Sequence, residues 1–428
     1  MTIDELYQHF NECSGVCTDT RKIKTGCLFF ALKGPNFNAN EFAQKAIELG
    51  AKFAVIDDDT YSGEQTLLVQ DVLECLQDLA RYHRSQFTFP IIGLTGSNGK
   101  TTTKELIYNV LATSKKVSCT QGNLNNHIGV PLTILSFDLD LDFGIVEMGA
   151  NHQKEIEFLC TISQPDFGLI TNFGKAHLEG FGGVEGVIKG KSELYDYLKL
   201  NGKYAFINTD DKKQLEQIGD YVNVISFGST ITNKFRIQLD SADPYVTISY
   251  NETVINSQLI GDYNFGNISV AVAIGGYFEL SPKTIKSGIE AYVPDNNRSE
   301  IINRGRNQII MDAYNANPTS MLAALVNFNK LEATNKYLFL GDMFELGEDA
   351  QKEHQEIVDY AEEHFNTNVY LLGIHFYNTV TESATQKFES LSSAIDTLKS
   401  IKLKNANVLI KGSRGMALER ILDYLDFE

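Results

Sequence analysis

A glycine-rich segment with one lysine and several hydroxyl side chains runs from Gly93 to Thr102, between an apolar run and a helical pattern. Small residues let successive backbone N–H groups turn inward around phosphate oxygens. Lys100 would then reach the β- and γ-phosphates, and the Thr101 hydroxyl would ligate Mg²⁺. Leu94 stands where the strict eight-residue pattern has glycine, so this loop is a variant. We predict a phosphate-binding loop, and the alternative is a glycine-rich turn without a ligand.

Two residues that can bind a metal ion follow further apolar runs of the same stretch. Glu147 comes at the end of the run 142–148, and His177 lies five residues after the run 166–172. Ligands bind beyond the carboxyl ends of the strands in a doubly wound sheet, and a carboxylate there can hold Mg²⁺. We therefore predict that both side chains face the bound nucleotide. The alternatives are an exposed strand-end glutamate and a solvated loop histidine. The spacing of Lys191 predicts only an exposed lysine near a helix start.

These residues lie in a chain whose patterns divide it into three parts. Residues 1–87 mix short strand-like and helical pieces and predict a small α/β domain. Residues 88–295 alternate near-continuous apolar strands with helices, which indicates a doubly wound parallel sheet covered on both faces. Within them, residues 234–260 are typical of meandering antiparallel strands. Residues 296–428 contain a second βα series, which predicts a smaller Rossmann-like domain. The predicted fold class is α/β.

The composition excludes several classes of protein. The 428 residues are 43% apolar and carry 37 Lys and Arg against 55 Asp and Glu, a net charge of −18. So acidic a chain is a poor nucleic-acid or anionic-membrane binder, and it can hold phosphates only through loops, helix ends and metal ions. The best apolar run, Ile268 to Phe278, is too short to cross a membrane, and the N-terminal segment has no signal-peptide pattern. The six cysteines lack zinc-type spacing and fit reduced thiols in the cytosol.

The combination of motifs resembles the Mur ligases, the ATP-dependent amide-forming enzymes of bacterial cell-wall synthesis. The resemblance covers almost the whole chain. The phosphate loop and Glu147 are common to the wider family, whereas Tyr314–Pro318 and Gly341–Met343 point to its dipeptide-adding member. The matching segments are Thr95–Thr102, Gly122–Pro131, Glu147–Ala150, Ala176–Gly182, Asp312–Pro318, Gly341–Gly347 and Lys411–Met416.

The resemblance implies a set of residues around ATP and two Mg²⁺ ions. Lys191 is expected to be carbamylated, because a carbamate supplies the oxygen ligand that a hard cation prefers and a lysine amine does not. The expected metal ligands are Thr101, Glu147, His177 and Lys191. The residues expected to be catalytic are Lys100, Lys191, His177 and Arg298. The residues expected to bind ATP are Thr95, Gly96, Ser97, Asn98, Gly99, Lys100, Thr101, Thr102, Asn264, Asn267, Arg298 and Asp312.

The same resemblance implies the substrates UDP-N-acetylmuramoyl-tripeptide and D-alanyl-D-alanine. ATP is expected to convert the terminal carboxylate of the tripeptide into an acyl phosphate, which the dipeptide amine then attacks. Tyr263 stands where many relatives have His, and Asn38-Ala39-Asn40 stands where many have Asp-Gly-His. The residues expected to bind these substrates are Thr18, Asp19, Thr20, Arg21, Asn125, Asn126, Tyr314, Asn315, Asn317, Lys411 and Arg414.

The resemblance also predicts a cytoplasmic monomer whose domains close around ATP, so that closure delivers Arg298 and Asp312. Three other interpretations stay open. A P-loop kinase or ATPase would give a phosphorylated product, or hydrolysis without an amine. A nucleotide-dependent binding or scaffold protein would show no turnover. A related ligase of folate polyglutamation or of another Mur step would use other substrates, although Tyr314–Pro318 and Gly341–Gly347 argue against it.

Overall fold

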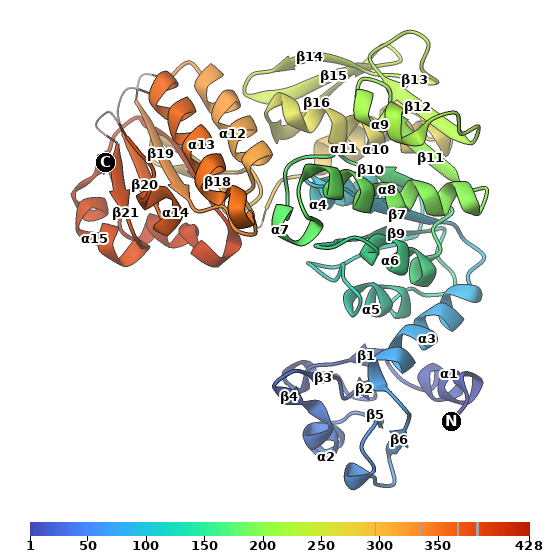
Figure 1. Ribbon diagram of the computed structural model, residues 1–428. Helices are drawn as coiled ribbons and strands as arrows, with labels where there is room; N and C mark the ends of the chain where they lie inside the picture. The colour runs from blue at the N-terminus through green and yellow to red at the C-terminus, as the bar shows by residue number, and fades with distance from the viewer. Residues whose placement is uncertain (296, 334, 366–367, 382–384) are drawn as a thin grey trace.

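The computed structural model describes residues 1–295, 297–333, 335–365, 368–381 and 385–428. Figure 1 shows three units, which we call N-terminal (residues 3–85, blue), central (91–291, cyan to yellow) and C-terminal (300–427, orange to red). The N-terminal unit hangs below the central one, and the C-terminal unit lies beside the central one (Figure 1). Over the described residues, no helix is long and apolar enough to cross a membrane.

The N-terminal unit is a small parallel sheet with three helices. Its strands lie in the order β1-β2-β5-β6, and all the pairs are parallel. The strands are β1 Val16–Cys17, β2 Leu28–Phe30, β5 Phe53–Ile56 and β6 Thr66–Leu68, and the helices are α1 Ile3–Asn11, α2 Ala43–Glu48 and α3 Val72–Ser85. A short ribbon pairs β3 Lys33–Gly34 with β4 Phe37–Asn38.

The central unit contains a seven-stranded sheet in the order β13-β12-β11-β10-β7-β9-β8, and all its pairs are parallel. Because β7 pairs with β9 on one side and β10 on the other, the carboxyl ends of three strands meet at one edge. The strands are β7 Ile91–Thr95, β8 Val117–Cys119, β9 Phe143–Glu147, β10 Phe167–Ile170, β11 Tyr204–Asn208, β12 Val224–Gly228 and β13 Phe235–Arg236.

Helices cover both faces of this sheet (Figure 1). All five residues of β7 are buried, as expected of a strand covered on both sides. The apolar run 268–278 lies mostly within α10, which is buried along most of its length and packs on α4. The helices are α4 Lys100–Ala112, α5 Gly129–Leu135, α6 Glu155–Ser163, α7 Leu178–Phe181, α8 Val184–Leu200, α9 Lys212–Ile218, α10 Phe265–Tyr277 and α11 Pro282–Ala291.

The predicted antiparallel meander is present as an added sheet. Strands β14 Gln238–Ala242, β15 Tyr245–Tyr250 and β16 Thr253–Ile260 pair in sequence order and antiparallel. The first residues of the predicted meander instead form β13, which joins the edge of the central sheet in parallel.

The C-terminal unit is a six-stranded sheet in the order β17-β18-β23-β19-β20-β21, and only its edge pair β17–β18 is antiparallel. The strands are β17 Glu300–Arg304, β18 Asn307–Asp312, β19 Lys336–Gly341, β20 Val369–Leu372, β21 Gln386–Phe388 and β23 Asn407–Lys411. A short ribbon pairs β22 Lys402–Leu403 with β24 Asp426–Phe427. The helices are α12 Pro318–Lys330, α13 Ala350–His364, α14 Ile374–Tyr377 and α15 Leu391–Ser400.

The α/β fold class and the three-part architecture are confirmed, whereas the domain limits at 87 and 295 stay predictions. The connection near the first limit is helical and packed: α3 contacts α1 of its own unit and also α5 and α6 of the central unit. The N-cap Asp71 accepts a hydrogen bond from the Glu74 amide at 2.8 Å, which fixes where this helix begins. The helix therefore attaches the N-terminal unit to the central one.

Candidate active site

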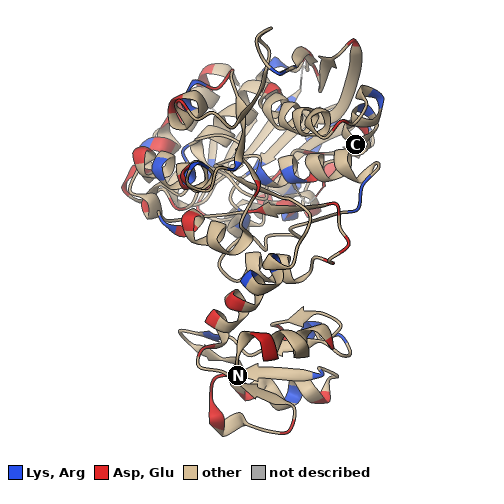
Figure 2. Ribbon diagram, turned by 90° about the vertical axis from the view of Figure 1, so that its right-hand side faces the viewer, with Lys and Arg blue, Asp and Glu red and all other residues tan. Residues whose placement is uncertain are grey.

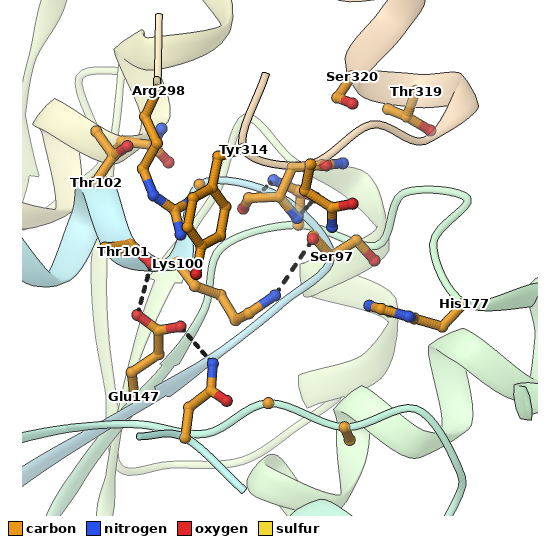
Figure 3. A pocket seen from close by; sticks show the side chains of 18 of the residues that line it. Ser97, Lys100, Thr101, Thr102, Glu147, His177, Arg298, Tyr314, Thr319 and Ser320 are labelled. Atoms are coloured by element: carbon orange, nitrogen blue, oxygen red, sulfur yellow. Dashed lines mark hydrogen bonds between the residues drawn. The ribbon is translucent and has the colours of Figure 1, made fainter. Parts of the chain in front are cut away.

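A cavity of about 540 Å³ lies where the carboxyl ends of the central strands face the C-terminal unit. Its lining comes from the phosphate loop, the ends of β9 and β16, the start of α10, the segment after β18 and the start of α12. Figure 3 shows Lys100, Thr101, Glu147 and His177 on the central side and Arg298 with Tyr314 opposite them. Polar side chains from both units therefore face one cavity.

The phosphate loop connects β7 to α4 with a backbone that only glycine adopts easily at its turn. Gly96 has φ +145°, and a Cβ there would lie 1.9 Å from Thr171 Oγ1. The Nζ of Lys100 donates to the carbonyl oxygen of Gly96 at 2.8 Å and to that of Ser97 at 3.3 Å. Burial lowers the pKa of Lys100, and the nearby Glu147 carboxylate opposes that change. The lysine thus lies folded back along its own loop.

The metal-binding candidates Thr101 and Glu147 are in direct contact. Thr101 Oγ1 donates to Glu147 Oε2 at 2.9 Å, and Asn125 Nδ2 donates to Glu147 Oε1 at 2.8 Å. Glu147 is buried at the end of β9, where Thr120 Oγ1 accepts a hydrogen bond from its backbone amide at 2.9 Å. A carboxylate and a hydroxyl oxygen held side by side suit a hard divalent cation.

His177 lines the same cavity, and its ring points into it (Figure 3). The residue has φ 54°, a left-handed conformation that is uncommon outside glycine. Its Nδ1 is hydrogen-bonded to the carboxylate of Glu345, which belongs to the C-terminal unit. Among the described residues no three His, Cys, Asp or Glu side chains come close enough together to hold a metal. A metal at this site would therefore need the Thr101 hydroxyl and groups beyond these four residue types.

Lys191 is not the exposed lysine that its spacing predicts, so that interpretation is wrong. It lies in the middle of α8, and its side chain is 0% exposed. Its Nζ donates to the carbonyl oxygen of Ala150 at 3.1 Å and lies 4.9 Å from the centre of the Phe181 ring. Burial, reinforced by the charge of Lys100, lowers the pKa of Lys191 well below its ordinary value. The amine lies behind Ala150, which itself lines the cavity.

The start of α10 supplies another wall of the cavity. Asn264 and Asn267 are buried and hydrogen-bonded to each other at 2.8 Å. Thr103 Oγ1 donates to Asn267 Oδ1 at 3.0 Å, which ties this helix to α4. The hydroxyl of Tyr263 is hydrogen-bonded to the Ser299 hydroxyl at 3.1 Å, across the connection between the central and C-terminal units.

An arginine from the connection before the C-terminal unit and a lysine–aspartate pair from that unit line the same cavity. The Arg298 guanidinium lies 3.6 Å from the centre of the Tyr314 ring. This cation–π contact fixes the orientation of the guanidinium. Lys411 Nζ donates to Asp312 Oδ2 at 2.5 Å, and both residues line the cavity with Asn315. Lys411, which is expected to bind substrate, is therefore paired with Asp312, which is expected to bind ATP.

Several predicted residues lie outside the cavity lining. Asn317 caps α12 and donates from Nδ2 to Asn98 Oδ1 of the phosphate loop at 2.6 Å. Arg414 is paired with Glu419 at 2.8 Å. The candidate uridine-binding residues Thr18, Asp19, Thr20 and Arg21 are in the N-terminal unit, where hydrogen bonds from Arg21 lower the pKa of Asp19 to about 2.

The predictions missed part of the lining at the start of α12. Thr319 and Ser320 face the cavity (Figure 3), and Thr319 Oγ1 accepts a hydrogen bond from the Lys175 amide at 2.9 Å. The sequence could have indicated this part of the lining. Asn317-Pro318 followed by hydroxyl residues is a pattern typical of a helix start, where the first backbone N–H groups have no partner within the helix. Glu345 was also missed, although it lies within the matched segment Gly341–Gly347.

Comparison with known proteins identifies the class that this fold and this cavity define. Residues 94–275 match the Mur ligase middle domain, and residues 297–414 match the Mur ligase, glutamate ligase domain. The chain belongs to the Mur ligase family.

Within this family the chain is similar to the D-alanyl-D-alanine-adding ligases. It is 34% identical over 425 residues to UDP-N-acetylmuramoyl-tripeptide–D-alanyl-D-alanine ligase of Bacillus subtilis (strain 168), covering 95% of this chain and 92% of the relative. The structure of MurF from Acinetobacter baumannii is 28% identical with a TM-score of 0.86 and covers 99% of this chain and 98% of that one. The MurF ligase from Thermotoga maritima in complex with ADP is 25% identical with a TM-score of 0.84, covering 97% of both chains.

Proposed function

We propose that this chain uses ATP to join D-alanyl-D-alanine to the terminal carboxylate of UDP-N-acetylmuramoyl-tripeptide, with release of ADP and phosphate. The observation that carries the proposal is the cavity that the phosphate-loop residues Lys100 and Thr101 share with Asp312 of the C-terminal unit and with Arg298 of the connection just before that unit. Full-length similarity to ligases of that name supports the choice of substrates. A protein that only hydrolyses ATP needs no second unit across from its phosphate loop.

Metal binding fits the donors on the central side. The Thr101 hydroxyl and the Glu147 carboxylate are adjacent oxygen donors, which match the preference of Mg²⁺. We propose that these two, His177 and a carbamylated Lys191 hold two Mg²⁺ ions. Bound there, the ions would offset phosphate charge and polarise the phosphoryl oxygens.

The environment of Lys191 supports carbamylation. An amine attacks carbon dioxide only in its neutral form, and burial lowers the pKa of Lys191 well below its ordinary value. A neutral amine is a poor ligand for Mg²⁺, whereas a carbamate offers oxygen. Intact-mass measurement of the protein kept in bicarbonate should show one added carbamate that is absent from Lys191→Met. An equal mass addition in that variant would contradict the assignment.

The reaction must bring two anions together, the substrate carboxylate and the γ-phosphate. At a separation of about 4 Å their repulsion is about 4 kcal/mol at an effective dielectric constant of about 20. Lys100 and Arg298 both line the cavity, and their positive charges would offset this repulsion as the phosphoryl group transfers. The carboxylate oxygen attacks the γ-phosphorus and ADP leaves. The dipeptide amine then attacks the acyl carbon, a proton leaves the nitrogen, and phosphate departs.

We propose further that residues 1–87 bind the uridine nucleotide through Thr18–Arg21, that residues 88–295 bind ATP, and that residues 296–428 bind the dipeptide near Asn315. Asn125, Asn126, Tyr314, Asn317, Lys411 and Arg414 are the other proposed substrate contacts. One chain supplies every side chain named for the reaction, so we propose a monomer, working in the cytoplasm where ATP and nucleotide-linked precursors are made.

The test is phosphate release by the purified chain with each substrate omitted in turn. We expect release only when ATP, Mg²⁺, the UDP-linked tripeptide and D-alanyl-D-alanine are all present, together with a product whose mass equals the sum of the two peptides less water. Phosphate release without the amine would favour an ATPase, and a stable phosphorylated product would favour a kinase. Equal activity with glutamate as the amine and a folate acceptor would favour the folate-type ligase.

A further inference from the structure

Glu345 is the point at which the C-terminal unit touches the candidate metal ligand His177. Its carboxylate is hydrogen-bonded to His177 Nδ1, and its carbonyl oxygen accepts a hydrogen bond from the Glu179 amide at 3.2 Å. The two residues that follow His177 in α7 are therefore held against the loop that carries Glu345. Both the side chain and the backbone of Glu345 contribute to this contact.

The loop that carries Glu345 is anchored from behind. Met343 N donates to His354 Nε2 at 3.0 Å, and Phe344 N donates to Ser413 Oγ at 3.0 Å. His354 is 0% exposed, and its Nδ1 faces the Ala350 carbonyl oxygen at 2.6 Å. Because Nδ1 must donate to that oxygen, Nε2 is left as an acceptor for the Met343 amide. Two consecutive amides immediately before Glu345 are thus fixed by side chains.

Both partners of the contact have left-handed backbones. His177 has φ 54° and Glu345 has φ 62°, and neither residue is glycine. Such conformations cost free energy for residues with a Cβ, and they persist where surrounding contacts hold them. Two of them facing each other across one hydrogen bond, at the edge of the cavity, indicate a fixed geometry rather than a chance surface contact.

We propose that Glu345 is a positioning residue that sets the tautomer and orientation of His177. When the carboxylate holds the proton on Nδ1, the imidazole presents Nε2 as its lone-pair donor. A histidine that binds a metal commonly donates its other ring N–H to a carboxylate in this way. That use of Nε2 rests on the proposed function, whereas the Nδ1 contact does not. Because Glu345 belongs to the C-terminal unit, the histidine is correctly set only while that unit is docked on the central one.

The docking that this arrangement requires is supported by contacts on either side. Lys175 Nζ is paired with Glu353 Oε1 at 2.5 Å, and Asn317 reaches Asn98 of the phosphate loop. The Glu353 side chain is 5% exposed and that of Lys175 is 37% exposed, so the acid of this interface pair is buried while the lysine is partly exposed to water. The tautomer and orientation of His177 would therefore depend on whether the C-terminal unit is docked on the central unit.

The test observes the His177 ring directly in the full-length protein without nucleotide or Mg²⁺. Selective nitrogen-15 labelling of histidine, with His177→Gln to assign the signals, reports which ring nitrogen carries the proton. We expect the proton on Nδ1 in the wild type and in Glu345→Gln, whose amide oxygen still accepts it. We expect it to move mainly to Nε2 in Glu345→Ala. The matched control is Glu348→Ala, which removes the same charge from an exposed residue of the same segment and should leave the ring unchanged.

Unchanged His177 signals in Glu345→Ala, or the same change in Glu348→Ala, would overturn the inference. In a ligase assay we expect Glu345→Ala to lower kcat about 10- to 100-fold with little change in the KM for the UDP-linked tripeptide, as for other carboxylates that orient a metal-binding histidine. An inactive wild-type protein would refute the proposed function, and the ring signals would still decide the role of Glu345.

Discussion

At the scale of single residues, the phosphate loop holds Lys100 in a position that we expect to change when nucleotide binds. Its Nζ now donates to the carbonyls of Gly96 and Ser97. Phosphate oxygens carry full negative charge and are stronger acceptors than these carbonyls, so bound nucleotide would draw the amine toward the cavity. The folded-back position keeps the amine hydrogen-bonded in the absence of nucleotide.

Replacing Lys100 should therefore affect turnover more than folding. We expect Lys100→Ala to lower kcat for phosphate release by about 10²- to 10³-fold, the usual cost of removing one preorganised donor from a site of developing charge. Lys115→Ala changes an exposed lysine beyond the end of α4 and should leave kcat within about twofold. A wild-type kcat in Lys100→Ala would show that this lysine takes no part in the reaction.

Site residues were predictable from the sequence where they form a short motif whose spacing is itself characteristic of phosphate binding. Gly96, Lys100 and Thr101 form a local pattern, and the structure places the last two at the cavity as such a pattern requires. Lys191 was not predictable from spacing, because its burial results from packing of α8 against residues distant in sequence. The partner of His177 was missed for the same reason, since Glu345 lies on a different unit.

At the scale of elements, the connection between α11 and β17 joins the two units that form the cavity. The hydroxyl of Tyr263, just before α10, is hydrogen-bonded to that of Ser299, which has φ 52°. Ser299 N also donates to Asp312 Oδ1 at 3.3 Å. Tyr263 thus links the wall formed by α10 to the connection that sets the position of Asp312.

Removing only the Tyr263 hydroxyl should loosen this link and leave the ring in place. We expect Tyr263→Phe to destabilise the protein by about 0.5–1.5 kcal/mol, the net value of one hydrogen bond, and to raise the KM for ATP severalfold. Urea unfolding and steady-state kinetics measure the two effects. Tyr263→Ala also removes the ring and should raise that KM further, so an equal KM in all three proteins would exclude the tyrosine from nucleotide binding.

Buried histidines on two helices should make stability depend on pH. Burial lowers the pKa of His83 on α3 and of His354 on α13 below the ordinary 6.5. As pH falls through 6.5, the unfolded chain binds these protons before the folded protein does, so the free energy of unfolding decreases. The slope should reach about 1.4 kcal/mol per pH unit for each histidine. Urea unfolding at a series of pH values should show a shallower slope in His83→Gln, and an identical slope would contradict the assignment.

Most helices and strands were predictable because their apolar periodicity is long and regular. The runs that became β7, β9, β10 and α10 are examples, since each is buried on more than one side. The edge strands β17 and β21 were not predicted. They are only partly buried, and their place in the sheet depends on pairing with strands elsewhere in the chain.

At the scale of the whole molecule, charge is distributed over all three units. Figure 2 shows acidic and basic residues interspersed along the ribbon of each unit, and the net charge is −18. The proposed substrates are polyanions, so they would have to bind against the overall field through Lys100, Arg298, backbone N–H groups and bound cations. The net charge therefore says little about the substrate.

The N-terminal unit is held to the central one by a buried arginine of α3. Arg84 donates to Asp166 Oδ2 at 2.8 Å and to the Ser163 carbonyl at 3.0 Å. We expect Arg84→Met to destabilise the protein by about 2 kcal/mol, because the Ser163 carbonyl loses a buried charged donor, while Asp166 keeps its pair with Lys203. Arg81→Met, one turn earlier, removes a solvent-exposed pair with Asp78 and should cost less than about 1 kcal/mol. If urea unfolding gave the same loss of stability for Arg84→Met and Arg81→Met, the buried contacts of Arg84 would not be what fixes α3.

The three-part architecture was predictable because each part has its own pattern of strands and helices. The relative placement of the units was not, since it depends on pairs such as Lys175 with Glu353 and Asn317 with Asn98, whose members are far apart in sequence. These pairs bring Arg298 and Asp312 to the same cavity as the phosphate loop.

In the proposed reaction the substrate carboxylate itself attacks ATP before the amine attacks the carbonyl carbon. The decisive measurement labels both oxygens of the terminal carboxylate of the UDP-linked tripeptide with oxygen-18 and analyses the phosphate released with D-alanyl-D-alanine. We expect one labelled oxygen in each phosphate and the other in the new amide. Unlabelled phosphate formed together with the amide product would contradict it.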